Sequence, residues 1–155
     1  MTSKELMREA IRLSVENVAN GGGPFGAVIA QNGIIISTGV NRVTDQCDPT
    51  AHAEVNAIRE ACARLKTFNL SGCEIYSSCE PCPMCLGALY WAHLDKLYYG
   101  NNKTDAAQIG FDDSFIYDEL DLNPSDRHLP SETLLRDEAI KAFREWDNKY
   151  DKIEY

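Results

Sequence analysis

Two successive strand–helix–strand units leave few folds open to this chain. The first runs from a strand at residues 34–40 through a helix at residues 48–65 to a strand at residues 73–77, and the second continues through a helix that begins at Pro81 to a strand at residues 97–100. Connections of this kind join parallel strands and place their helices over the sheet. The helix at residues 48–65 is expected to face the sheet through its apolar residues Val55, Ile58, Cys62 and Leu65.

A helix and a hairpin precede these units. Apolar residues at helical spacing predict a helix from Ser3 to Asn20, which the segment Gly21–Pro24 ends. Asn32-Gly33 then joins two β-rich runs, residues 27–30 and 34–40, and both turn residues tolerate the positive φ of a two-residue hairpin loop. The order of elements predicts an α/β protein with a mixed sheet and helices packed on its faces.

The last third of the chain gives weaker signals. A short helix is expected over residues 114–120, turns at Asn123-Pro124 and Leu129-Pro130, and an amphipathic helix over residues 137–149. Residues 131–135 fit either a fifth strand or the start of that helix.

Length and composition predict one domain. The 155 residues are enough for a hydrophobic core without disulfides, and no apolar run approaches the roughly 20 residues of a membrane span. The N-terminal segment alternates charged and apolar residues, unlike a signal peptide. We therefore expect a single cytoplasmic domain over residues 1–155 that does not bind membranes, with its six cysteines reduced.

The charge distribution disfavours nucleic acid as a partner. The formal net charge is −9, and residues 101–155 alone carry 7 basic against 14 acidic side chains. Nucleic-acid binding draws most of its affinity from neutralised phosphates, so an acidic chain is poorly suited to it. A small uncharged substrate fits this charge better.

A pair of cysteines at a helix start suggests a metal site. Cys82 and Cys85 are three residues apart, so their side chains project from one face of the predicted helix within reach of a single ion. Together with the imidazole of His52, their thiolates form a donor set suited to zinc. Three protein ligands leave one tetrahedral position open for water, as in catalytic zinc sites.

His52 and Glu54 lie about 200° apart on an ideal helix, which at first separates them. Both fall in the first turn, however, and helical Cα–Cβ bonds tilt toward the N-terminus, so both side chains can converge beyond the helix tip. Two helix N-termini facing the metal would favour thiolate. We expect His52 to be a ligand and Glu54 to carry a proton between water and substrate.

Other cysteines leave alternatives open. Cys79 has ligand spacing relative to Cys82, but it precedes the helix start and is expected to point elsewhere. A lone CxxC also fits a redox pair or half of a structural zinc site. The remaining cysteines are expected to be packing residues: Cys47, Cys62 and Cys73.

The two motifs together form the H-x-E and P-C-x-x-C signature of nucleobase deaminases, and the chain resembles the cytidine deaminase superfamily. Within it, the chain is most similar to the small bacterial guanine deaminases, over nearly its whole length. The resemblance implies a three-layer α/β/α cytidine deaminase-like fold. The segments that carry it are Gly23–Ala27, Thr50–Glu54, Ser78–Cys85, Gly110–Tyr117 and the terminal Glu154-Tyr155.

The resemblance also implies roles for individual residues. It makes His52, Cys82 and Cys85 the ligands of one zinc ion per subunit and Glu54 the proton shuttle. It implies that Asn41 hydrogen-bonds the purine, and that Asp113 accepts from the N–H edge of guanine, which suits an acceptor-only carboxylate. Further residues at the substrate would be Phe25 and Trp91 along the ring faces, Ala53, and Tyr155 closing the pocket.

Some of these roles have simpler alternatives. Asp112 and Asp113 could cap a helix that begins near Ser114, and Trp91 could belong to the core. Tyr155 could act in its own subunit or in the partner of a homodimer, on which residues 131–155 would pack.

The activity that follows from the resemblance is hydrolysis of guanine to xanthine and ammonia. In that reaction water adds at C2 while Glu54 protonates ring N3 and then the departing amine. Three rivals remain open: a tRNA adenosine deaminase, a deaminase of guanosine or an aminotriazine, and a non-catalytic protein with a structural zinc ion.

Overall fold

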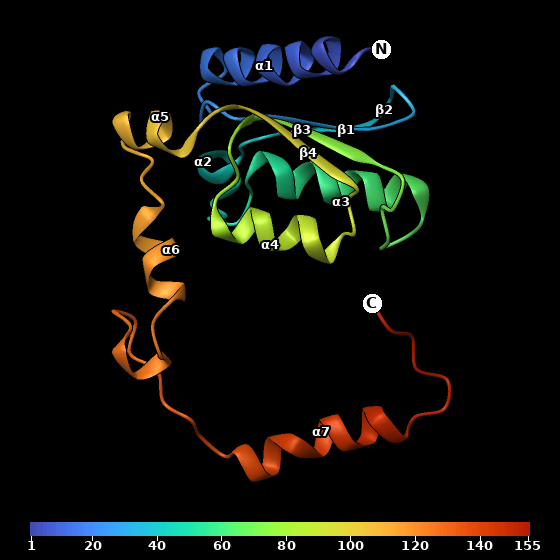
Figure 1. Cartoon of the computed structure of the whole chain (residues 1–155), viewed down its shortest axis with the longest axis vertical. Helices are drawn as coiled ribbons and strands as arrows, with labels where there is room; N and C mark the ends of the chain where they lie inside the picture. The colour runs from blue at the N-terminus through green and yellow to red at the C-terminus, as the bar shows by residue number, and fades with distance from the viewer. The chain divides into compact units, whose positions relative to one another are not determined.

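A four-stranded mixed sheet forms the centre of the protein, which we describe from a computed structural model covering all 155 residues (Figure 1). The strands are β1 (Gly26–Gln31), β2 (Ile34–Val40), β3 (Glu74–Cys79) and β4 (Lys96–Asn101), in the order β2-β1-β3-β4. Strand β1 is antiparallel to both β2 and β3, whereas β3 and β4 are parallel. The mixed sheet predicted from the sequence is therefore confirmed.

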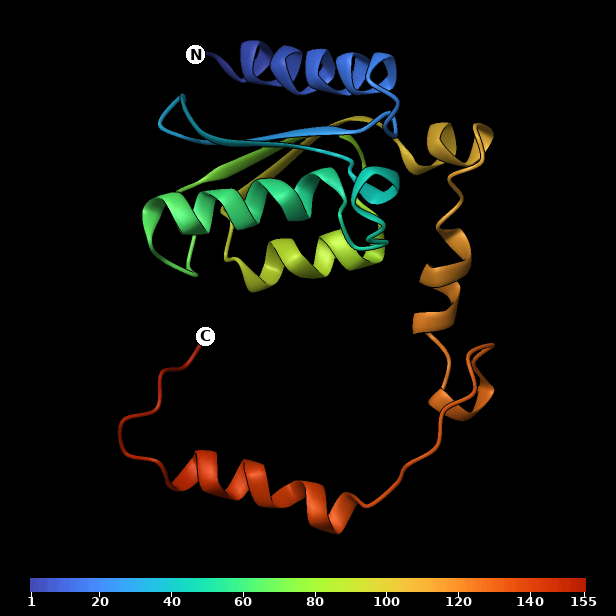
Figure 2. The ribbon, with the colours of Figure 1, turned by 180° about the vertical axis from the view of Figure 1, so that it is seen from behind.

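Helices cover both faces of this sheet, as Figures 1 and 2 show. Helix α1 (Ser3–Ala19) lies on one face, and the crossover helices α3 (Ala53–Leu65) and α4 (Pro83–Trp91) lie on the other. Alternation along β1 divides its side chains between the two layers. Val28 faces α1, and Ile29 faces α3 and α4. The three-layer architecture is as expected.

Helix α3 packs on the sheet through smaller residues than the sequence suggested. Its buried residues are Ala53, Glu54, Ala57 and Ala61. Ile58 and Cys62 pack at the edge of this core, but Leu65 is 40% exposed, so its expected place on the packed face was wrong. Small residues are needed at the start of α3 because the helix approaches β2 closely there. A Cβ atom at Gly39 of β2 would lie 2.1 Å from the carbonyl oxygen of Ala53.

Two short helices were not predicted. Helix α2 (Val43–Gln46) follows β2, and α5 (Lys103–Gln108) follows β4. Helix α5 begins with a capping box in which Asn102 and Asp105 each accept a hydrogen bond from the other's backbone N–H. That signal is readable in the sequence, but a six-residue helix offers little periodicity to support it.

The chain forms two compact units, residues 1–114 and residues 115–155. The second contains most of α6 (Ser114–Leu120), a 3₁₀ turn η1 (Pro124–Asp126) and α7 (Arg136–Asn148). Residues 131–135 form neither of the predicted alternatives, because Leu135 has a φ of 53° and immediately precedes α7. Helix α7 buries none of its residues. All helices fall short of the length and apolar character that a bilayer span requires.

Candidate active site

The N-termini of α3 and α4 bring one imidazole and two thiols together. His52 is the N-cap of α3, Cys82 is the N-cap of α4, and Cys85 lies in the first turn of α4. His52 Nδ1 lies 3.5 Å from Cys82 Sγ and 3.4 Å from Cys85 Sγ. The three potential ligand atoms all lie within 4.8 Å of one another, which suits a single metal ion.

Local sequence explains why these side chains meet. An N-cap residue has extended backbone, and its side chain usually accepts a hydrogen bond from the first turn. Neither His52 nor Cys82 makes such a bond, although both have the extended N-cap conformation. Pro83 at the start of α4 fixes a helical φ and removes one backbone N–H that would otherwise need a partner. Both N-cap side chains therefore point into the cluster instead of capping their own helices.

The cluster favours a thiolate. The pKa of Cys82 is lowered to about 4, because its sulfur accepts hydrogen bonds from Cys85 and His52. The pKa of His52 is raised, because its ring is hydrogen-bonded to Cys82. The positive ends of the two helix dipoles stabilise this thiolate. The thiolate and the imidazole are in turn the donors that attract a divalent cation such as zinc.

The donor set fits zinc in the pattern of a catalytic site. Cys79 is buried, its thiol donates to the carbonyl of Asn102 at 3.9 Å, and burial raises its pKa to about 11. It therefore does not join the cluster as a fourth ligand. Cys62 and Cys73 lie in or against the core, as expected of packing residues. Cys47 is exposed at the end of α2, so its expected packing role was wrong.

Glu54 lies in the first turn of α3 beside this cluster. Its side chain is 5% exposed, and its Oε1 accepts a hydrogen bond of 2.9 Å from the hydroxyl of Ser77. Burial raises the pKa of Glu54. Ser77 was missed in the sequence, where a lone serine inside a strand gives no functional signal.

Asn41 follows β2 and is held by three neighbours. Its Oδ1 accepts from the backbone N–H of Val43 at 3.1 Å, and its backbone N–H donates to the carbonyl of Phe25 at 3.2 Å. Asn17 of α1 donates its side-chain amide to the carbonyls of Asn41 and Gly23, at 2.9 and 2.7 Å. Asn17 was also missed, because a helical asparagine usually faces solvent.

The two aspartates of the 110–113 loop have different surroundings. Asp112 accepts hydrogen bonds from the backbone N–H and hydroxyl of Ser114, at 2.9 and 2.6 Å, as in an Asx turn ahead of α6. Partial burial raises the pKa of Asp113, and the nearby Cys82 adds to that rise. Phe111 packs edge-to-face on Phe25 with ring centroids 5.0 Å apart, which ties this loop to the strand start beside Asn41.

Trp91 and the cluster lie at opposite ends of α4. Trp91 is the last residue of α4, about 9 Å along the helix axis from Cys85. Its side chain is 66% exposed, so it is not a core residue either. Ala53 is fully buried between His52 and Glu54, and Tyr155, in the second unit, is 74% exposed.

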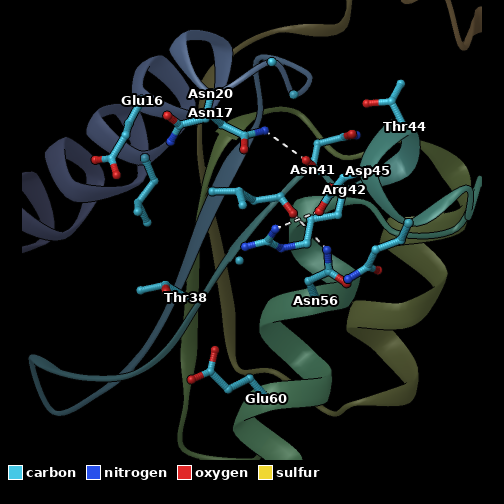
Figure 3. Close-up of a pocket in the computed structure, with 16 residues that line it drawn as sticks. Glu16, Asn17, Asn20, Thr38, Asn41, Arg42, Thr44, Asp45, Asn56 and Glu60 are labelled. Carbon is cyan, nitrogen blue, oxygen red and sulfur yellow. Dashed lines mark hydrogen bonds and ion pairs between the residues drawn. The ribbon is translucent and has the colours of Figure 1, made fainter.

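A separate polar cavity of about 690 Å³ lies beside the edge strand β2 (Figure 3). Its walls come from α1, β2, α2 and α3, and they include neither the three metal-binding side chains nor Glu54. Figure 3 shows Asn17 reaching the backbone of Asn41 across this cavity, while Asn56 donates to the carbonyl of Val40 at 2.8 Å. Asn41 itself therefore lines the cavity, whereas His52, Cys82, Cys85 and Glu54 lie outside its walls.

Comparisons with known proteins agree with this geometry. Residues 1–101 match the family described as the cytidine and deoxycytidylate deaminase zinc-binding region. The chain is 49% identical to the guanine deaminase of Bacillus subtilis (strain 168) over the full length of both. An X-ray structure of guanine deaminase from Bacillus subtilis superposes with a TM-score of 0.97, covering 100% of this chain and 99% of that one. A tRNA-specific adenosine deaminase of Aquifex aeolicus (strain VF5) is 42% identical over 64% of this chain and 66% of its own.

The geometry of the three ligands predicts which cysteines are needed to bind zinc. Cys82→Ser or Cys85→Ser should lower the metal content from about one zinc ion per chain to a small fraction, because each removes one of only three protein ligands. Cys79→Ser should keep its zinc, because that thiol faces Asn102. Metal analysis of the purified variants, with circular dichroism as a check on folding, measures both. Equal zinc loss in Cys79→Ser would contradict the assignment.

Proposed function

The chain belongs to the cytidine and deoxycytidylate deaminase zinc-binding family, and we propose that within this family it hydrolyses guanine to xanthine and ammonia. The observation that carries the proposal is the extent of the match. Identity to the Bacillus subtilis guanine deaminase continues past residue 101, where the family region ends, to the end of the chain. It thus includes the loop with Asp113, whereas the Aquifex aeolicus tRNA deaminase matches only 64% of the chain.

The proposed roles at the metal follow from the cluster. His52, Cys82 and Cys85 would hold zinc, and the arrangement leaves one coordination position without a protein ligand. Zinc, when bound, lowers the pKa of a coordinated water toward neutrality and so supplies a nucleophile.

Glu54 is the proposed proton carrier. Its buried carboxylate would take a proton from the attacking water as the new bond forms at C2 of guanine, and pass it to N3. A second proton, from the hydroxyl now on C2, would pass through Glu54 to the amine. The C2–N bond then breaks, the C2 carbonyl forms and ammonia leaves. Burial keeps bulk water from competing for these protons.

The proposed substrate contacts use the surroundings of the cluster. Because Oδ1 of Asn41 already accepts from Val43, its side-chain NH₂ is the group that would donate to an acceptor on the purine. Asp113 would accept from the N1–H edge, since Asp112 is engaged with Ser114. Phe25, braced by Phe111, would contact the ring. The backbone of Ala53 would lie against the base beside the metal.

Trp91 and Tyr155 are proposed to act across subunits. Trp91 lies at the end of α4, about 9 Å along the helix axis from Cys85, and a homodimer offers a way for this exposed aromatic residue to reach a partner's site. Helix α7 supports a partner copy, because its apolar side is uncovered, with Phe143 73% exposed.

The molar mass in solution tests whether the chain forms a homodimer. Light scattering after gel filtration should give the mass of two chains, and Phe143→Asp should shift it toward one chain, because a charge on the apolar side of α7 opposes burial. Lys141→Asp, on the polar side of the same helix, should leave the mass unchanged. A wild-type protein that elutes as one chain at micromolar concentration would contradict the dimer.

A substrate panel tests the reaction itself. Ammonia release should be fast with guanine and slower by at least about 100-fold with adenine and cytosine, because only guanine presents both N1–H and a 2-amino group to the site. Guanosine and ammeline belong in the same panel, as does tRNA with an adenosine at the wobble position. Turnover of the tRNA above that of guanine would favour the adenosine deaminase rival, and no turnover of any member would favour a structural zinc protein.

The mechanism predicts that replacing Glu54 lowers turnover sharply without loss of zinc. Glu54→Gln should keep its zinc but lose about 100- to 10,000-fold in kcat, because the amide can hydrogen-bond yet cannot carry the proton. Metal analysis and steady-state kinetics on the same preparation give the two numbers. Retained turnover in zinc-loaded Glu54→Gln would remove this residue from the mechanism.

A further inference from the structure

Ser77 lies in the sheet beneath the candidate active site and belongs to neither sequence motif. It is on β3, 2% exposed, and pairs with Ala27 of β1. Ile75, two residues earlier, lies in the core between the sheet and α3, so strand alternation places the Ser77 side chain on the same face. A hydroxyl is thus buried in a core otherwise built mainly from aliphatic side chains.

The partner of this hydroxyl is the carboxylate of Glu54. Ser77 Oγ donates to Glu54 Oε1 at 2.9 Å, and Glu54 is itself only 5% exposed. A hydrogen bond to a charged acceptor in a buried setting is stronger than one between neutral groups. It also joins β3 to α3, and therefore fixes the carboxylate relative to the sheet as well as to its own helix.

We propose that Ser77 is a positioning residue for the deamination, and that by holding Oε1 of Glu54 it leaves Oε2 as the oxygen that carries the proton. The inference rests on the proposed function, because it gives Glu54 the proton transfer. The first proton moves from water to Oε2 and on to N3, and the second moves from the new C2 hydroxyl to Oε2 and on to the amine, while Ser77 keeps its own proton throughout. Without the hydroxyl, the carboxylate loses the hydrogen bond that ties it to the sheet and spends less time aligned for transfer.

Ser78 provides a matched control on the same strand. It is 3% exposed, and its Oγ accepts a hydrogen bond of 3.0 Å from the backbone N–H of Gly26. Alternation places its side chain on the opposite face of the sheet, toward α1. Ser77→Ala and Ser78→Ala therefore each remove one buried hydroxyl from adjacent positions, and only the first removes a partner of Glu54.

The test compares zinc-loaded, full-length variants with guanine as substrate. Ser77→Ala should lower kcat by about 10- to 100-fold, as loss of an outer-shell partner does, with KM within about twofold of the wild type. Its zinc content should stay near one ion per chain. Ser77→Thr, which keeps the hydroxyl, should recover most of kcat, and Ser78→Ala should match the wild type.

Several results would overturn the inference. These are a kcat for Ser77→Ala within about twofold of the wild type, equal losses in Ser77→Ala and Ser78→Ala, a change in KM alone, or loss of zinc. If the wild type itself fails to deaminate guanine, the proposed function fails separately. A crystal structure of Ser77→Ala then decides: a rotated Glu54 carboxylate supports the positioning role, and an unmoved one contradicts it.

Discussion

The close packing of α3 on β2 is the contact on which the arrangement of the site depends. At Gly39 the sheet approaches the helix so closely that only small residues fit between them, among them Ala53 and Ala57. Ser37 of β2 strengthens the contact by donating to the carbonyl of Ala57 at 2.7 Å. Because the contact includes the first residue of α3, it sets the position of the His52 and Glu54 side chains relative to the sheet. Larger residues here would lift the helix from the sheet and displace both side chains.

Buried polar groups then link this tip to the rest of the first unit. Ser77 joins Glu54 to β3, and Asn17 joins α1 to the segments of Gly23 and Asn41. Each of these groups has a defined partner, and no buried side-chain nitrogen or oxygen lacks one. Such satisfied hydrogen bonds select one arrangement of the layers, which apolar contacts alone specify less sharply. The site therefore depends on polar residues from all three layers.

Predictions from the sequence were correct where they depend on residues close together in the chain. The order of strands and helices followed from periodicity, and the spacing of Cys82 and Cys85 on one helix pointed to a shared ion that the structure makes feasible. They failed on the packed face of α3, where Leu65 was expected inside and alanines are buried instead. Hydrophobicity ranks leucine above alanine, but the available space between helix and sheet is a property of the packed layers. The prediction of a strand or a helix start at residues 131–135 was also wrong, since a positive φ at Leu135 has no sequence signal in a non-glycine residue.

The sequence by itself determined the four strands and the longer helices, the metal-binding residue types and the acidic character that disfavours nucleic acid. These are set by spacing along one helix or strand and by composition, both of which are readable without a fold. Only the tertiary structure decided that Cys79 faces Asn102, that Ser77 meets Glu54 and that Asp113 lies near Cys82. Each of these depends on the direction of a side chain relative to a residue on another segment. Such directions are fixed when the layers pack, because the same local sequence is compatible with several of them.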